Sequence, residues 1–266
     1  MRDYSGKNPC ISARGQKPLH FAAMSGQMQI CEKILGNVAN KYPKDNRGKT
    51  PLHYASENGY IDLCLLLINY NSDINIKNNF GRTPLHNAAS KGHLEMCTFF
   101  INNGADPNIT DEHKQTPLHY AAQEGNLSIC QFFLDKGALK NPGDDWRMTP
   151  LHDAALHGHL KICKLFIDHV EDISSRNIKG YTPLFIAFKK CNFTVCYPLA
   201  WKTMKKKWSR FTQRDWSIQL SVIFFENYQR PIHEQVEALT HERDMLKKSI
   251  FHCFAMFTNI IAYVFI

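Results

Sequence analysis

Histidine and cysteine recur at a fixed distance along this chain, and the two side chains together can bind zinc or carry out nucleophilic chemistry. The segment "TPLHYAAQEGNLSIC", residues 116–130, places His119 and Cys130 eleven residues apart. The same spacing separates four other pairs: His20 and Cys31, His53 and Cys64, His86 and Cys97, and His152 and Cys163. A site replicated five times without any Cys-x-x-Cys spacing argues against a metal centre. We therefore interpret these residues as structural and predict neither a metal site nor a cofactor.

The same repetition defines the elements that carry these residues. Proline recurs every 33 residues, at Pro18, Pro51, Pro84, Pro117, Pro150 and Pro183. Fixed self-similarity at this period is typical of stacked repeats. In one unit, Thr50 can cap a helix that starts at Pro51, and Gly59 can end that helix in the left-handed conformation.

A second helix is expected in the same unit at about residues 61–69. Its apolar side would contain Ile61, Cys64, Leu65 and Ile68, which follow one another at helical spacing. One such pair of helices cannot bury its apolar face alone, whereas a stack of pairs can.

The residues of one unit resemble the ankyrin repeat. Residues 81–109, "GRTPLHNAASKGHLEMCTFFINNGADPNI", give the fullest match to that motif, and the resemblance covers residues 13–201 in six units. It implies an all-α repeat solenoid of helix-turn-helix units with β-hairpin finger loops, followed here by a helical tail. It also implies that the motif histidine supports its turn by hydrogen bonding. The periodic cysteines take a place where the family usually has a small aliphatic residue.

The two terminal units depart from the pattern. In the sixth unit Phe185 replaces the motif histidine, Cys191 replaces the left-handed glycine, and Pro198 falls inside the second helix, where it is expected to kink that helix. We interpret this unit as a distorted C-terminal cap, since terminal repeats are usually atypical. In the first unit Lys17 replaces the capping threonine, and the outer face of this unit would end the stack.

The chain divides into a lead at residues 1–12, six repeats at 13–201, a basic linker at 202–231 and a C-terminal helix at 232–266. The net charge is +8, and residues 202–214 alone contain six basic side chains and no acidic one. This stretch is either a solvated linker or a contact for anionic lipid. A nuclear import signal is a further reading, and we do not expect a nucleic-acid partner.

The last segment, residues 249–266, contains no Asp, Glu, Lys or Arg. As a helix it would be about 27 Å long, close to the thickness of a bilayer core. Lys247 and Lys248 precede it, as expected on a cytosolic border. His252 and Asn259 oppose a membrane location, so a membrane anchor and a packed capping helix both stay open.

The resemblance implies that the chain binds another protein through its finger tips and first helices. We predict ten surface residues, taken from two columns of the fingers: Arg14, Arg47, Lys49, Phe80, Arg82, His113, Gln115, Trp146, Met148 and Tyr181. Trp146 and Tyr181 are expected to form an exposed aromatic pocket beside a basic strip, which favours an acidic or mixed partner. Lys114 and Arg147 replace the turn glycine in two fingers, and we expect those loops to be distorted.

These observations predict a cytoplasmic protein-binding scaffold or adaptor, tethered to a membrane if residues 249–266 span it. The N-terminus has no apolar signal segment, and the periodic cysteines suit a reducing compartment. One alternative is the N-terminal cytosolic part of a larger ankyrin-bearing membrane protein, such as a cation channel. A second is a soluble adaptor, located in the cytosol or the nucleus. The sequence contains no P-loop, no G-x-G-x-x-G after a strand and no G-x-S-x-G elbow, so we do not expect an enzyme.

Overall fold

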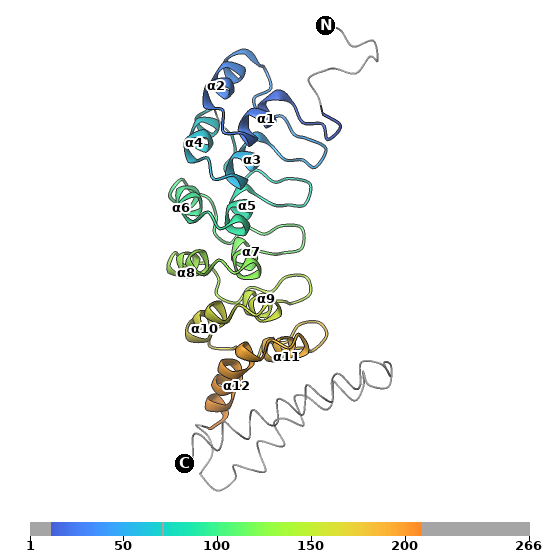
Figure 1. Cartoon of the computed structure of the whole chain (residues 1–266), viewed down its shortest axis with the longest axis vertical. Coiled ribbons are helices and arrows are strands. Elements are labelled where there is room, and N and C mark those ends of the chain that lie inside the picture. Colours follow the sequence, from blue (N-terminus) through green and yellow to red (C-terminus); the bar gives the residue numbers. More distant parts are fainter. Residues whose placement is uncertain (1–11, 71, 209–266) are drawn as a thin grey trace. The chain divides into compact units, whose positions relative to one another are not determined.

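The computed structural model describes residues 12–70 and 72–208, and this part of the chain contains twelve helices and no β-strand (Figure 1). By its contacts the chain divides into two units, Met1–Ala154 and Ala155–Ile266, which we describe separately. The solenoid prediction is confirmed, but the fingers are not confirmed as β-hairpins. The predicted tail helix and apolar segment, residues 232–266, lie outside the described residues, as does most of the basic linker.

The first unit contains four complete helix pairs. These are α1 (Pro18–Met24) with α2 (Met28–Asn37), α3 (Pro51–Glu57) with α4 (Ile61–Asn69), α5 (Pro84–Lys91) with α6 (Leu94–Asn102), and α7 (Pro117–Glu124) with α8 (Leu127–Asp135). The first helices pack on one another in sequence order, α1 on α3, α3 on α5 and α5 on α7. In Figure 1 they form one row, the second helices form another, and the finger loops extend on the side of the first helices.

The start of each first helix follows from local chemistry. Thr50 precedes Pro51, and its side chain accepts a hydrogen bond from the backbone of His53. The His53 side chain in turn accepts one from the backbone N–H of Thr50, which satisfies two of the donors that a helix start leaves free. At the other end of such a helix Gly92 has φ 82°, the left-handed conformation that glycine adopts without steric cost.

The core lies between the two rows of helices. Cys31, Cys64, Cys97 and Cys130 are fully buried there, as small apolar side chains. The predicted face of α4 was partly wrong, because Leu65 is exposed and the core positions beside Cys64 are Leu63 and Leu67. Residues 63–68 are all aliphatic or cysteine, so the helical period of apolar residues does not distinguish one face of α4 from another. The packing of neighbouring helices decides which face is buried.

Each finger ends in a tight turn. The backbone N–H of Asp45 donates to the carbonyl of Lys49 at 3.0 Å, and the Asp45 carboxylate accepts from the N–H groups of Arg47 and Lys49 at 2.9 and 2.8 Å. Lys114 and Arg147 have φ values of 60° and 56°, the conformation that glycine has in the other fingers. Their turns close in the same way, so the predicted distortion of these two loops was wrong.

The second unit contains α10 (Leu160–His169), α11 (Pro183–Lys189) and α12 (Phe193–Trp208), while α9 (Pro150–His157) spans the division. Phe185 is buried, and Cys191 takes the left-handed conformation with φ 59°. Helix α12 continues through Pro198 to Trp208, past residue 201, where the last repeat was predicted to end. Among the described residues, no helix combines the length and apolarity needed to cross a membrane.

Candidate protein-binding surface

The motif histidines connect neighbouring repeats. His53 Nδ1 accepts from the backbone N–H of Thr50 at 3.1 Å, so in the neutral ring Nε2 carries the proton. Nε2 lies 3.0 Å from the carbonyl oxygen of Arg82 in the next repeat and donates to it. Three other histidines make the same link, from His20 to Lys49, from His86 to Gln115 and from His119 to Met148. The predicted hydrogen-bonding role is confirmed and extends to the next repeat.

Burial keeps these histidines and the periodic cysteines uncharged. It lowers the pKa of His53, His86 and His119 to about 4. Burial also raises the pKa of the Cys97 and Cys130 thiols to about 12. A neutral buried thiol is a poor nucleophile and a poor metal ligand, so these pairs have a structural role.

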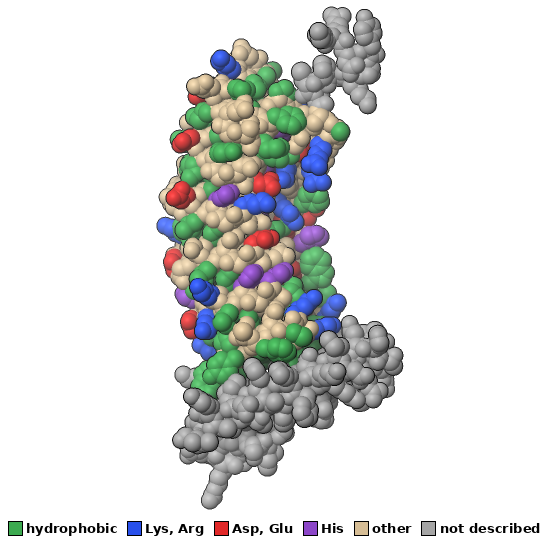
Figure 2. Space-filling view, in the orientation of Figure 1, with side chains coloured by type: hydrophobic (Ala, Val, Ile, Leu, Met, Phe, Trp, Pro, Cys, Tyr) green, Lys and Arg blue, Asp and Glu red, His purple; other side chains and the backbone are tan. Residues whose placement is uncertain are grey.

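The outer finger column consists of Arg14, Arg47, Phe80, His113 and Trp146, all exposed. Their side chains point to solvent, and Phe80 and Trp146 are 49% and 44% exposed. Each backbone carbonyl from Arg14 to His113 accepts from the N–H of the next finger at 3.0–3.1 Å, which holds the column in register. Figure 2 shows basic, hydrophobic and histidine side chains following one another along this edge of the first unit.

The C-terminal end of the outer finger column is aromatic. The rings of His113 and Trp146 lie 5.1 Å apart between centroids, at an interplanar angle of 42°. Beside them the Lys114 ammonium pairs with the Asp145 carboxylate at 3.0 Å. Trp146 therefore contacts the His113 ring and still leaves almost half of its surface accessible.

The inner finger column lies two residues further along each finger and consists of Gln16, Lys49, Arg82, Gln115 and Met148 in the first unit. Its polar members are occupied by contacts within the array. Lys49 Nζ lies 2.6 Å from the Glu57 carboxylate, and the Arg82 guanidinium lies 5.0 Å from the centre of the Tyr120 ring. Gln16 is buried and donates to the Tyr54 hydroxyl at 2.8 Å.

The contact partners of the inner finger column were not predicted from the sequence. The Tyr54 hydroxyl donates to the Asp45 carboxylate, and the Tyr120 hydroxyl to the Asp111 carboxylate, both at 2.7 Å. Gln115 Nε2 similarly donates to Asp144 at 3.3 Å. The signal was present in the sequence, because each tyrosine follows its aspartate by nine residues. These contacts fix the direction of the inner side chains.

Tyr181 was predicted to be exposed, and this prediction was wrong. The side chain is only 7% exposed, and its ring lies 4.5 Å from that of Phe185 between centroids. Because Phe185 replaces the motif histidine, the tyrosine ring finds an apolar neighbour where other repeats have a polar one. The exposed aromatic pocket of Trp146 and Tyr181 is therefore discarded. Lys179, at the corresponding sequence position of the sixth finger, is exposed.

Comparison with protein families agrees with this geometry. A family model described as ankyrin repeats matches the chain in three copies, over residues 4–78, 66–144 and 139–207. Comparison with curated proteins gives no match. Ankyrin repeats form a protein-interaction scaffold and are typically non-enzymatic. With stacked helix pairs, capped first helices and a family match over most of its length, the chain belongs to the ankyrin-repeat family.

Proposed function

We propose that the outer finger column binds the partner protein of this scaffold. One observation supports the choice above all others, the contrast between the two columns. Outer side chains are exposed and include Arg, Phe and Trp, whereas the polar inner side chains already make contacts within the array. Tryptophan and arginine are the residues that most often dominate binding energy at interfaces.

The order of residues in the outer finger column suggests the chemistry of the partner. Arg14 and Arg47 form a basic end, and Phe80, His113 and Trp146 form an aromatic end. An extended partner segment with acidic residues at one end and an apolar or aromatic residue at the other matches this order. Neighbouring first helices pack about 10 Å apart, so such a segment would extend over roughly 40 Å.

Selection from a displayed random-peptide library against the full chain tests this proposal. Selected peptides should combine acidic with apolar residues. Replacing Phe80→Ala and Trp146→Ala together should weaken their binding by about 30-fold, the effect of losing one hot spot. Leu139→Ala is the matched control, because Leu139 is also an exposed apolar side chain but lies outside the finger columns. Equal affinity of the double variant and the wild type would show that the outer finger column is not the site.

We further propose that residues 249–266 tether the scaffold to a membrane, on the basis of their length and lack of charge. The test compares carbonate-resistant partitioning of the full chain with that of a chain ending at Lys248. Retention of the full chain alone supports the tether, and with it the alternative of a cytosolic array on a larger membrane protein. Release of both, with earlier melting of the shorter chain, supports a packed capping helix and a soluble adaptor.

The basic stretch at residues 202–214 would add to this tether through anionic lipid. Sedimentation of the chain ending at Lys248 with vesicles of phosphatidylserine and phosphatidylcholine tests this addition. Binding that falls when the phosphatidylserine is left out supports a lipid contact. Binding that does not depend on the anionic lipid contradicts it.

A further inference from the structure

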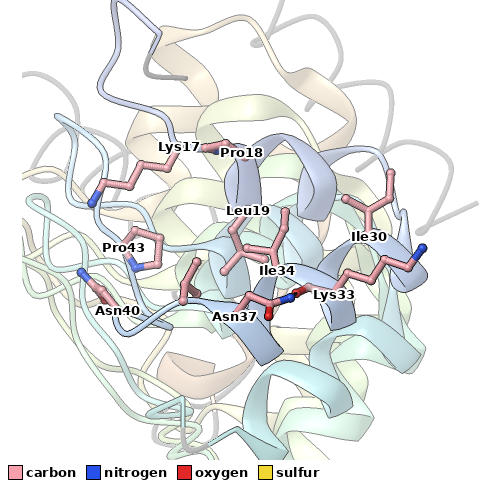
Figure 3. A pocket seen from close by; sticks show the side chains of 10 residues that line it. Lys17, Pro18, Leu19, Ile30, Lys33, Ile34, Asn37, Asn40 and Pro43 are labelled. Carbon is pink, nitrogen blue, oxygen red and sulfur yellow. Dashed lines mark hydrogen bonds between the residues drawn. The ribbon is translucent and has the colours of Figure 1, made fainter. Parts of the chain in front are cut away.

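The first repeat presents an apolar outer face, which we call the N-terminal face. It consists of Pro18 and Phe21 in α1, Ile30 and Ile34 in α2, and Val38, which directly follows α2. A groove of 440 Å³ lies between the two helices. Leu19 and Ile34 lie close together in the middle of it, with Lys17 and Pro43 toward one end and Ile30 and Lys33 toward the other (Figure 3).

Equivalent positions in the following repeats are buried. Ile30 is 45% exposed, whereas the residues at the same place in the next three repeats, Leu63, Met96 and Ile129, are 2%, 1% and 1% exposed. Ile34 is half-buried, whereas Leu67, Phe100 and Phe133 are fully buried. The surroundings within each repeat are alike, so the difference comes from the preceding repeat, which covers this face in the interior of the stack.

Phe21 supports the same conclusion. It is 46% exposed, whereas Tyr54 and Tyr120 at the equivalent positions are 9% and 6% exposed. Tyr54 packs edge-on against His20 and Tyr120 against His86, each in the preceding repeat, at centroid distances of 5.9 and 5.5 Å. The N-terminal face therefore continues the established interface between repeats, and it exposes the apolar residues that this interface normally buries.

A polar outer face is what terminal repeats of a solenoid need in order to remain soluble. The N-terminal face instead has large apolar side chains, with Glu32 and Lys33 adjacent and exposed on α2. Two copies related by a two-fold axis would place apolar side chain against apolar side chain. Such an arrangement also allows Glu32 of each copy to oppose Lys33 of the other. We propose that two copies of this chain dock through their N-terminal faces and form a symmetric dimer.

Analytical ultracentrifugation of the full chain tests the proposal, in a non-ionic detergent so that residues 249–266 do not drive association. The wild type should show a monomer–dimer equilibrium. Ile30→Asp and, separately, Phe21→Asp should weaken it by about tenfold or more, because each buries a charge in the interface. Leu65→Asp is the matched control, since Leu65 is 42% exposed on α4 but lies outside the N-terminal face. Circular dichroism should show the same helix content in all three variants.

Two outcomes overturn the proposal. A wild type that stays monomeric up to about 100 μM shows that this face does not join two copies of the chain. A dimer that survives both Ile30→Asp and Phe21→Asp uses another surface. Charge exchange then tests the two-fold arrangement, because Glu32→Lys alone should weaken the dimer and Glu32→Lys with Lys33→Glu should restore it. Failure of the double exchange to restore association overturns the two-fold pairing.

Discussion

The outer and inner finger columns lie two residues apart along each finger and yet differ in what their side chains contact. Arg47 is exposed, whereas Lys49, in the same turn, pairs with Glu57 and lies over the Tyr54 ring. Chemically similar residues are therefore exposed at one position, where we propose that a partner binds, and in contact with the array at the other. The difference arises because the Lys49 side chain lies against the first helix of its own repeat, whereas the Arg47 side chain is exposed.

The largest effect that we expect is a loss of folding stability at acid pH, through the histidines that bind the backbone of the inner finger column. The motif histidines donate to the backbone carbonyls of this column and have pKa values lowered to about 4 for His53, His86 and His119. Unfolded histidine has a pKa near 6.5, so below that pH the unfolded chain binds more protons and stability falls with decreasing pH. Each of the three should cost about 2 kcal/mol between pH 7 and pH 5.

Urea unfolding at pH 7, 6 and 5 measures this loss. His86→Asn is the control, because asparagine keeps an acceptor and a donor without titrating in this range. Its stability at pH 7 should be lower, but its decline toward pH 5 should be smaller by about 2 kcal/mol. The same decline in the variant and the wild type would contradict the assignment of the acid response to these histidines.

A smaller loss is expected when one partner of the inner finger column is removed. The buried Asp111 carboxylate accepts from the N–H groups of His113 and Gln115, both at 2.9 Å, and from the Tyr120 hydroxyl. Asp111→Ala should lower the free energy of unfolding by about 3 kcal/mol, at roughly 1 kcal/mol for each hydrogen bond. Urea unfolding measures it, and Glu112→Ala, at the exposed neighbouring position, should change it by less than about 0.5 kcal/mol. Similar losses in the two variants would show that the buried network adds little.

The smallest effect on stability is expected in the outer finger column. Trp146→Ala removes a half-exposed ring that contacts the His113 ring, so the free energy of unfolding should change by about 0.5 kcal/mol or less. The same variant should weaken binding of the selected peptides. Thermal unfolding and peptide affinity, measured on one preparation, check both parts. A large loss of stability would mean that the two columns are not separate in function.

Much of the fold was predictable because its signals are local. Thr50, Pro51 and His53 lie within one helical turn, and their capping pattern indicates the start of the helix without reference to the rest of the chain. The face of α4 was less predictable, because Leu63 and Leu65 are both apolar and only contact with neighbouring helices distinguishes them. The roles of residues 202–266 stay predictions, apart from the helical course of α12 to Trp208.

The candidate site shows the same division between local and long-range causes. The repeat spacing placed Arg47 and Lys49, and likewise Phe80 and Arg82, at the tips of the fingers. It could not predict which residue of each pair is accessible to a partner. Tyr181 illustrates why, since its burial depends on a phenylalanine at position 185 that other repeats lack. By itself the sequence determined the repeat period, the helix starts and the turns, because these depend on residues a few positions apart. Only the tertiary structure decided which finger side chains are accessible, because that depends on contacts between repeats, such as those of Gln16 with Tyr54 and of Arg82 with Tyr120.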